Sequence, residues 1–339
     1  MCGRTCLTLA PDEVQCACKY QSDAETKEKI KPEWRSEYNC GKNYEPSHNI
    51  APTDVTPVLV SSAHFGSEAD TKQRMLVPML WGMIPFWHKG DYRKHGLTTN
   101  NCRLEHLLES KLYSRPFRKG QRCVVVCEGF YEWQTTKTAK PSERAVHYIY
   151  MPQDDEIKIS DRRTWQAGNI RLLKMAGLFD VWENENGDKI FSYSVITYES
   201  SSLLSWMHHR MPAILEDDQQ VANWLNYSKM PGDEALSILR PVSKLCWYQV
   251  SNVVNNSRNK STDCNKPMEE LKKAKGQVVP KSKIMEKWLV IRKRKEESVK
   301  NLEDDDDDNE DASRDTKKPK LSRASKSSDI SSKSESPNC

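Results

Sequence analysis

The aromatic residues divide this chain into two parts of different character. Every Phe and Tyr precedes residue 249, and beyond that point the one remaining aromatic residue is Trp288. Aromatic side chains dominate protein cores because each buries about 150–250 Å². We therefore expect a packed core that ends near residue 265, and we assign one folded domain to residues 2–268.

Residues 269–339 form the second part. They end in the charged, Ser-rich stretch "SVKNLEDDDDDNEDASRDTKKPKLSRASKSSDISSKSESPNC". A segment of this composition cannot bury enough apolar surface to offset the entropy that it would lose on ordering. We predict that this tail is mostly disordered.

Composition narrows the classes of function. The formal net charge is only +4, so binding to nucleic acid would have to rest on local clusters of basic residues. The 11 cysteines include no C-x-x-C pair, and the short spacings at 2/6, 16/18 and 123/127 lack the second pair that a zinc site needs. We predict reduced thiols and no metal.

The chain has no secretory signal and no apolar run of about 20 residues, so we expect no membrane partner.

Apolar and alternating runs predict a mixed α+β fold. Strands are expected at 55–62, 122–133, 147–152, 172–182 and 190–198, and helices at 11–21, 101–110 and 216–227. The strands do not alternate regularly with long helices, which argues against a doubly wound parallel sheet. We predict a curved, mostly antiparallel sheet or barrel with flanking helices.

Four short stretches combine residue types that can carry chemistry. They are "MCGR" at the start, "TTNNCR" (98–103), "EGFYEW" (128–133) and "HHRMPAIL" (208–215). Each also has a structural explanation, such as a thiol near a chain end, solvated carboxylates at a strand end or hydrogen-bonded histidines. Cys2 becomes special if Met1 is removed, because one residue then carries both a free α-amine and a thiol.

Two further stretches, "YEPSHNIAPT" (44–53) and "WGMIPFW" (81–87), complete a series of motifs that resembles the SOS-response-associated peptidase (SRAP) family over about residues 2–260. The resemblance implies a covalent link to abasic sites in single-stranded DNA. The Cys2 amine, with an ordinary pKa of about 7.7–8.0, would condense with the sugar aldehyde, and the Cys2 thiol would close a thiazolidine ring. Removal of Met1, by the chain itself or by an aminopeptidase, would expose that amine.

The resemblance also implies roles for individual residues. Glu132 and His208 match the glutamate and histidine that transfer protons in the family, and Asn101 matches an asparagine near the Cys2 amine. Arginines would contact phosphates, and an apolar surface and the N-I-A-P loop would line the DNA cleft. The expected DNA-binding residues are Arg4, Arg103, Arg210, Asn49, Pro52, Trp81, Pro85, Phe86 and Trp87. Core packing is an alternative for each of the last four.

The expected partner is single-stranded DNA with abasic sites, bound by a monomer without a cofactor at nuclear replication forks. The cross-link would shield the site from cleavage and error-prone bypass, and it would be reversible. The tail contains a stretch that resembles a docking motif for the replication sliding clamp, Lys287, Trp288, Leu289 and Val290. An amphipathic helix packed on the core would explain this stretch as well. "KKPK" (317–320) fits a nuclear-import signal.

Two other functions remain open at the level of sequence. One is a non-catalytic reader of modified cytosine, such as 5-hydroxymethylcytosine, whose function would survive replacement of Cys2 by Ala. The other is a general cysteine peptidase, which would need Cys–His geometry around a peptide groove and whose activity would not depend on DNA. Neither would require a free amine on Cys2.

Overall fold

The computed structural model describes one compact unit. The described residues are 2–21, 28–66, 73–138, 140–166 and 168–276, and they belong to a unit that spans residues 1–277. The expected clamp-docking stretch, the import signal and most of the predicted disordered tail therefore lie outside the described residues. Among the described helices, none combines the length and the apolarity that crossing a membrane requires.

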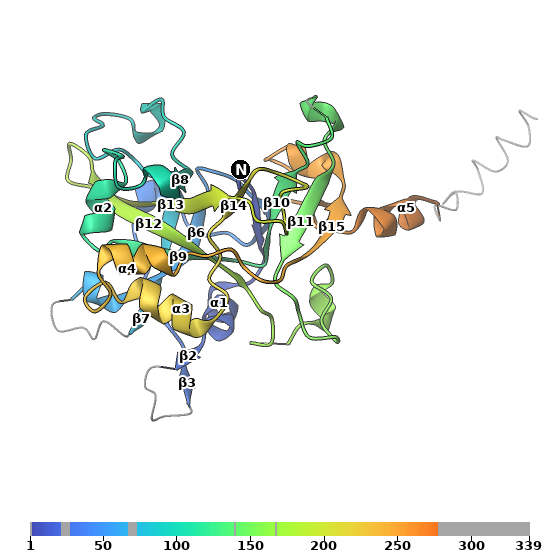
Figure 1. The fold of residues 1–339 in the computed structure, drawn as a ribbon, viewed down its shortest axis with the longest axis horizontal. Helices are drawn as coiled ribbons and strands as arrows, with labels where there is room; N and C mark the ends of the chain where they lie inside the picture. The colour runs from blue at the N-terminus through green and yellow to red at the C-terminus, as the bar shows by residue number, and fades with distance from the viewer. Residues whose placement is uncertain (1, 22–27, 67–72, 139, 167, 277–339) are drawn as a thin grey trace, which may run out of the picture. The chain divides into compact units, whose positions relative to one another are not determined.

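The larger of two main sheets closes on itself (Figure 1). Its strands are β4 Glu33–Trp34, β6 Val55–Ser61, β7 Arg74–Trp81, β8 Asn101–Arg103, β9 Arg122–Cys127, β12 Leu173–Glu183, β13 Lys189–Glu199 and β14 Arg210–Pro212. The order is β14-β13-β12-β9-β6-β7-β4, with β8 beside β13, and an additional pairing of β13 with β7 closes a barrel-like ring. Most neighbouring strands are antiparallel, while β13–β7, β13–β8 and β4–β7 are parallel. The predicted α+β fold with a curved, mostly antiparallel sheet is confirmed.

The second sheet carries the N-terminal strand. Its strands are β1 Thr5–Leu7, β5 Ser47–Ile50, β10 Gly129–Trp133, β11 Val146–Tyr150 and β15 Cys246–Val250, in the order β15-β11-β10-β1-β5. A separate small pair consists of β2 Tyr20–Gln21 and β3 Lys29–Ile30. All pairs in the second sheet are antiparallel. The sheet therefore brings the start of the chain next to the end of the "EGFYEW" motif.

Short helices flank the sheets. They are α1 Pro11–Ala17, α2 Ser114–Arg118, α3 Asp218–Leu225, α4 Gly232–Ser237 and α5 Met268–Gly276, with 3-10 turns at Asn39–Gly41, Ser62–His64, Tyr92–Lys94, Leu104–His106, Pro141–Glu143, Arg162–Thr164, Asn252–Asn255 and Thr262–Cys264. The Asp217 side chain caps α3 by accepting from the Gln220 N–H at 2.7 Å. Trp224 fixes α3 to β9 through a buried hydrogen bond from Nε1 to the Cys123 carbonyl at 2.8 Å.

Two sequence predictions of secondary structure are wrong. The helix expected at 101–110 begins instead as strand β8, because Asn101–Arg103 pairs in parallel with β13. The strand expected at 122–133 is two strands in different sheets, broken at Glu128. At Gly129 a Cβ would lie 2.5 Å from the Tyr148 ring, so glycine allows β10 to approach β11.

Candidate functional site

Cys2 is fully buried and its backbone is held from two sides. The chain ahead of β1 runs along β10, where the Arg4 carbonyl accepts a hydrogen bond from the Tyr131 N–H at 2.9 Å. On the other side, the Asn101 side chain donates from Nδ2 to the Cys2 carbonyl at 2.8 Å. Two predicted site residues that lie far apart in sequence, Cys2 and Asn101, are therefore in direct contact.

Glu132 on β10 is the carboxylate whose charge acts on Cys2. Burial raises the pKa of Glu132 above its usual range. Burial also raises the pKa of the Cys2 thiol, and the negative charge of Glu132 raises it further. The thiol is therefore protonated at neutral pH. Since the thiolate is the reactive form of cysteine, any reaction at this sulfur must move a proton.

His208 is buried beside the end of β10. The residue before it is fixed there, because the Met207 carbonyl accepts from the Thr135 N–H at 2.9 Å. Burial lowers the pKa of His208 to about 4, so the ring is neutral at physiological pH. Nδ1 of His208 lies 3.0 Å from the Arg210 backbone N and 3.2 Å from the Arg210 carbonyl oxygen, so it accepts from the first or donates to the second according to the tautomer. In either tautomer the neutral ring has one N–H donor and one acceptor nitrogen.

The arginines predicted to contact phosphate lie in different environments. Arg103 on β8 is exposed. Arg210 on β14 is buried, and both of its terminal nitrogens bind the Glu105 carboxylate, with Nη2 lying 3.0 Å from Oε2. Nη2 also donates to the Thr197 carbonyl at 2.8 Å. Arg210 therefore ties β14 to β13 and to the turn that follows β8.

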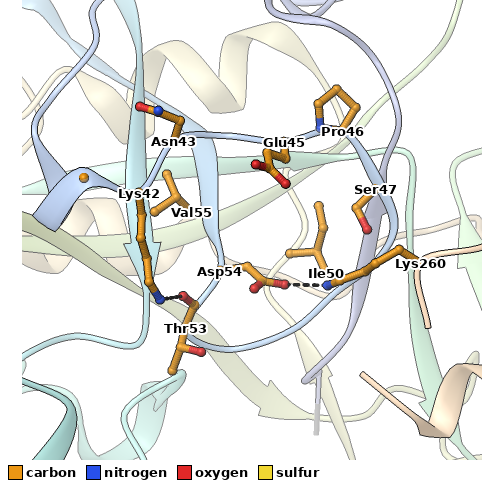
Figure 2. Close-up of a pocket in the computed structure, with 11 residues that line it drawn as sticks. Lys42, Asn43, Glu45, Pro46, Ser47, Ile50, Thr53, Asp54, Val55 and Lys260 are labelled. Atoms are coloured by element: carbon orange, nitrogen blue, oxygen red, sulfur yellow. Dashed lines mark hydrogen bonds and ion pairs between the residues drawn. The ribbon is translucent and has the colours of Figure 1, made fainter. Parts of the chain in front are cut away.

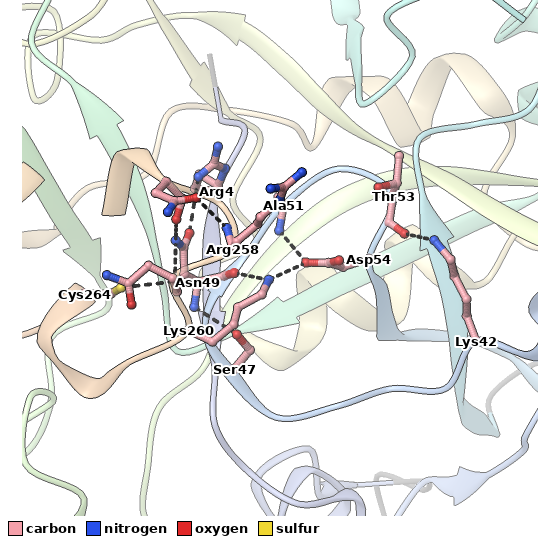
Figure 3. Close-up of polar contacts among 12 residues, drawn as sticks. Arg4, Lys42, Ser47, Asn49, Ala51, Thr53, Asp54, Arg258, Lys260 and Cys264 are labelled. Carbon is pink, nitrogen blue, oxygen red and sulfur yellow. Dashed lines mark hydrogen bonds and ion pairs between the residues drawn. The ribbon is translucent and has the colours of Figure 1, made fainter. Parts of the chain in front are cut away.

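Arg4 and Asn49 belong to a polar network (Figure 3). Asn49 is fully buried, and its Nδ2 lies within hydrogen-bonding distance of the carbonyls of Val254, Asn256 and Asn259, at 3.2, 3.0 and 2.9 Å. Arg4 donates from Nη1 to the Val254 carbonyl at 3.0 Å and lies 3.4 Å from Oδ1 of Asn49. This network joins the N-terminal strand to the loop after β15. A direct contact of Asn49 with DNA would require it to open.

The N-I-A-P loop borders a cavity of about 440 Å³ (Figure 2). Lys42 and Lys260 approach the loop from opposite sides in this view. Lys42 donates to the Thr53 carbonyl at 2.9 Å, and Lys260 donates to the Asn49 carbonyl at 2.6 Å and pairs with Asp54 at 2.9 Å. Thr53 has a φ of 80°, which is strained for a β-branched residue. The two lysines therefore hold a strained loop, in which the neighbouring Pro52 is half-buried.

The predicted apolar surface divides into a buried and an exposed half. Trp81 is buried and stacks on Tyr193 with ring centroids 6.3 Å apart, and Pro85 is buried as well. Phe86 and Trp87 are 39% and 40% exposed and meet edge to face at 4.9 Å. The pair Phe86–Trp87 is thus the part of this motif that solvent, or a ligand, can reach.

Sequence reasoning missed several residues that hold the site. Glu105 went unnoticed because an isolated exposed-looking Glu gives no signal, although it is the partner of Arg210. The segment "VVNNSRNK" (253–260) also went unnoticed, although its run of Asn was an available signal for a polar network. Glu128, the first carboxylate of "EGFYEW", accepts from the Thr8 hydroxyl at 2.8 Å and lies apart from this set of contacts. Among the described residues no group of three or more His, Cys, Asp or Glu could hold a metal ion.

Several proteins of similar sequence are named abasic site processing proteins. A protein from Xenopus tropicalis named "Abasic site processing protein HMCES" is 41% identical over 308 residues, which is 89% of this chain and 89% of that protein. The protein of the same name from Mus musculus is 38% identical over 306 residues, covering 88% of this chain and 84% of the relative. A Saccharomyces cerevisiae abasic site processing protein is 30% identical over 231 residues, which is 66% of this chain and 54% of that protein.

Solved structures share the fold. The crystal structure of a protein from Bacteroides thetaiotaomicron has a TM-score of 0.57 at 21% identity and covers 79% of this chain and 100% of its own. A protein from Bordetella bronchiseptica has a TM-score of 0.53 at 17% identity, with coverages of 74% and 100%. The family described as SOS response associated peptidase (SRAP) matches residues 1–257. This chain therefore belongs to the SRAP family.

Proposed function

We propose that this protein processes abasic sites in single-stranded DNA by forming a covalent cross-link through Cys2. The observation that carries the proposal is the placement of Cys2, whose carbonyl is held by Asn101 at 2.8 Å and whose thiol is affected by the Glu132 carboxylate. The substrate class is taken from the names of the relatives. While Met1 precedes Cys2, its nitrogen is a peptide amide and cannot condense with an aldehyde. The reaction therefore requires prior removal of Met1.

The cross-link forms in two bond-making steps. The Cys2 amine adds to the aldehyde carbon of the opened deoxyribose, and one water leaves, which gives an imine. The Cys2 sulfur then bonds to the same carbon while its proton passes to Glu132, and the former imine nitrogen takes up a proton. The product is a thiazolidine ring, the net loss is one water, and no oxidant is needed. A carboxylate with a raised pKa suits the transfer, since it can both accept and return a proton.

His208 assists at the sugar. With a pKa of about 4 it is neutral at physiological pH, and a neutral imidazole offers one N–H donor and one acceptor nitrogen. This donor would bind the sugar hydroxyl and favour the ring-opened aldehyde. The reverse reaction uses the same groups, so the protein would also release the DNA again.

The DNA itself would lie against the exposed residues. Phe86 and Trp87 offer rings for a splayed base, and each lies close to a cation, Arg115 at 4.4 Å and Lys111 at 4.7 Å from the ring centroid. Arg103 is exposed for a phosphate contact. The other predicted DNA-binding residues hold the surrounding backbone in place and do not contact the DNA themselves. They are Arg4, Asn49, Pro52, Trp81, Pro85 and Arg210. We propose that the protein acts in the nucleus, and the proposed docking of the sliding clamp at 287–290 rests on sequence alone.

The decisive experiment is the intact mass of the protein mixed with abasic single-stranded DNA. We expect a protein that lacks Met1 and an adduct lighter than the sum of its parts by one water. Cys2→Ala should form no adduct, whereas Cys2→Ser should form an imine that survives only after reduction. Cys16→Ala is the matched control and should react normally. A normal adduct on protein that retains Met1 would rule out the proposed chemistry, and an unaltered DNA function of Cys2→Ala would favour a non-catalytic reader.

A further inference from the structure

A second cavity lies between α2, the start of β9 and the loop that joins α3 to α4. Its volume is about 640 Å³, within the range of roughly 300–1,000 Å³ that is usual for small-molecule sites. The lining comprises Leu108, Phe117, Arg118, Lys119, Gly120, Arg122, Tyr227, Met230, Pro231, Gly232 and Asp233. Arg118 and Lys119 are exposed, whereas Arg122 is 2% exposed. The cavity thus combines basic groups with aromatic and apolar surface.

Arg122 is a buried guanidinium that the protein leaves uncompensated. Nη2 donates to the Met230 carbonyl at 3.0 Å, but the Nε–H and the two Nη1–H groups have no acceptor among the described residues. The guanidinium lies over the Trp224 ring at 5.4 Å, and no carboxylate of the described part of the chain forms an ion pair with it. Burial lowers the pKa of Arg122 to about 10. An unpaired charge in such a place is unfavourable, so the site favours an external anion.

We propose that this cavity binds a phosphate group carried on a planar organic body, as in a nucleotide. A phosphate monoester offers charged oxygens to the N–H groups of Arg122 that lack acceptors, and Arg is well suited to such oxygens. Arg118 and Lys119 add positive charge at the rim, which exceeds the single negative charge of Asp233. A volume of about 640 Å³ leaves room beyond one phosphate, and the partly exposed Tyr227 and Met230 and the exposed Pro231 offer apolar surface to a planar base.

This site is separate from Cys2. Strand β9 has 6 residues and begins at Arg122, whereas the chain reaches β10 and Glu132 only after its far end. A strand of this length spans roughly 20 Å. The proposal therefore does not depend on the cross-linking chemistry and would stand if Cys2 were inert.

The test is calorimetric titration of the full-length protein in a phosphate-free buffer with dAMP, deoxyadenosine and inorganic phosphate. We expect dAMP to bind at least about tenfold more tightly than deoxyadenosine, because charge-assisted hydrogen bonds to the phosphate are lost in the latter. Equal affinity for the two would overturn the proposal. A 5′-phosphorylated oligonucleotide and its 5′-hydroxyl counterpart identify the source of the phosphate, since a strand end requires that the first binds more tightly than the second and a free nucleotide requires that the two bind equally.

Variants locate the binding. Arg122→Met removes the buried charge and keeps the volume, and it should weaken dAMP binding about 10- to 100-fold. Arg103→Met, in the candidate DNA site, should leave dAMP binding unchanged. The opposite pattern would assign dAMP to the DNA site and overturn the proposal. If Arg122→Met does not fold, the double variant of the exposed Arg118→Met and Lys119→Met decides, with an expected loss of about two- to fivefold and no loss if the proposal is wrong.

Discussion

Arg210 and Arg122 are both nearly buried, yet the protein compensates their charges differently. Arg210 is 7% exposed and binds the Glu105 carboxylate and the Thr197 carbonyl. Arg122 is 2% exposed and donates to one backbone carbonyl. Burial of a guanidinium therefore does not by itself indicate a ligand site. What matters is whether the protein supplies the anion, as it does for Arg210, or leaves donors for an external one, as it does for Arg122.

The same comparison separates residues that hold the structure around Cys2 from residues that we propose to act in the reaction. Arg210 holds β14 in place through its side chain, and its backbone lies within hydrogen-bonding distance of Nδ1 of His208. Glu132, by contrast, acts on Cys2 through its charge. Changes at Arg210 should therefore alter stability and geometry, whereas a change at Glu132 should alter the rate of the chemical step.

The largest expected effect is that of Glu132→Gln on cross-linking. Positioned acid–base groups typically contribute about 10²–10⁴-fold to a rate, and we expect a loss of this size in single-turnover cross-linking. Because formation and reversal share one transition state, release from a purified adduct should slow as well. Glu143→Gln, at an exposed position, is the matched control and should react like the wild type. Rates within twofold of wild type for Glu132→Gln would show that this carboxylate is structural.

The second effect concerns stability and tests the comparison directly. Arg210→Met loses hydrogen bonds to Glu105 and Thr197, and it should lower the free energy of unfolding by about 1–3 kcal/mol. Arg122→Met loses one hydrogen bond but removes an uncompensated buried charge, so its free energy of unfolding should be unchanged or higher. Urea unfolding of both variants in phosphate-free buffer measures this difference. Equal losses would mean that the fold compensates Arg122 after all.

The sequence predicted the parts of the fold that local patterns determine. Helix α3 follows from the spacing of Val221, Trp224 and Leu225 and from the Asp217 cap, all of which lie within ten residues. Strand β8 could not be found in this way, because its extended form depends on pairing with β13, about ninety residues later. A pattern of helical spacing was overridden there by a tertiary contact.

The candidate site shows the same limit. The motifs named Asn101 and Arg210, and the family resemblance placed Asn101 near the Cys2 amine, but neither showed which atoms these side chains contact. The contact of Asn101 with Cys2 and the pairing of Arg210 with Glu105 arise from strands that meet only in the folded chain. The identity of the candidate residues was therefore readable from sequence, whereas the contacts on which their proposed roles rest needed the fold.

The third effect is a pH dependence of stability. Burial lowers the pKa of His208 in the folded protein to about 4, below the ordinary value of about 6.5. As the pH falls from about 6.5 toward 4, the unfolded chain binds a proton that the folded chain does not, so stability is lost across this window. His208→Gln should show a smaller loss than the wild type in thermal unfolding between pH 7 and pH 4.5. Burial likewise lowers the pKa of His64, near Arg122, to about 4. The His64→Gln variant therefore tests the same effect of pH on stability in the region of Arg122.

The smallest expected effect is on the salt dependence of DNA binding, and it separates a phosphate contact from a scaffold arginine. Each phosphate that a protein neutralises on a single strand contributes about −0.7 to the slope of log K against log salt. Arg103 is exposed, so Arg103→Gln should make the slope shallower by about 0.7, which is one contact. Arg210 is already paired with Glu105, so in Arg210→Gln protein that remains folded the slope should be unchanged, even if affinity falls. Fluorescence anisotropy with an undamaged oligonucleotide at several salt concentrations measures both. A slope that becomes shallower by the same amount in the two variants would show that the Arg210–Glu105 pair opens to receive DNA. In that case, whether the protein pairs a buried arginine with a carboxylate would no longer tell whether that arginine binds a ligand.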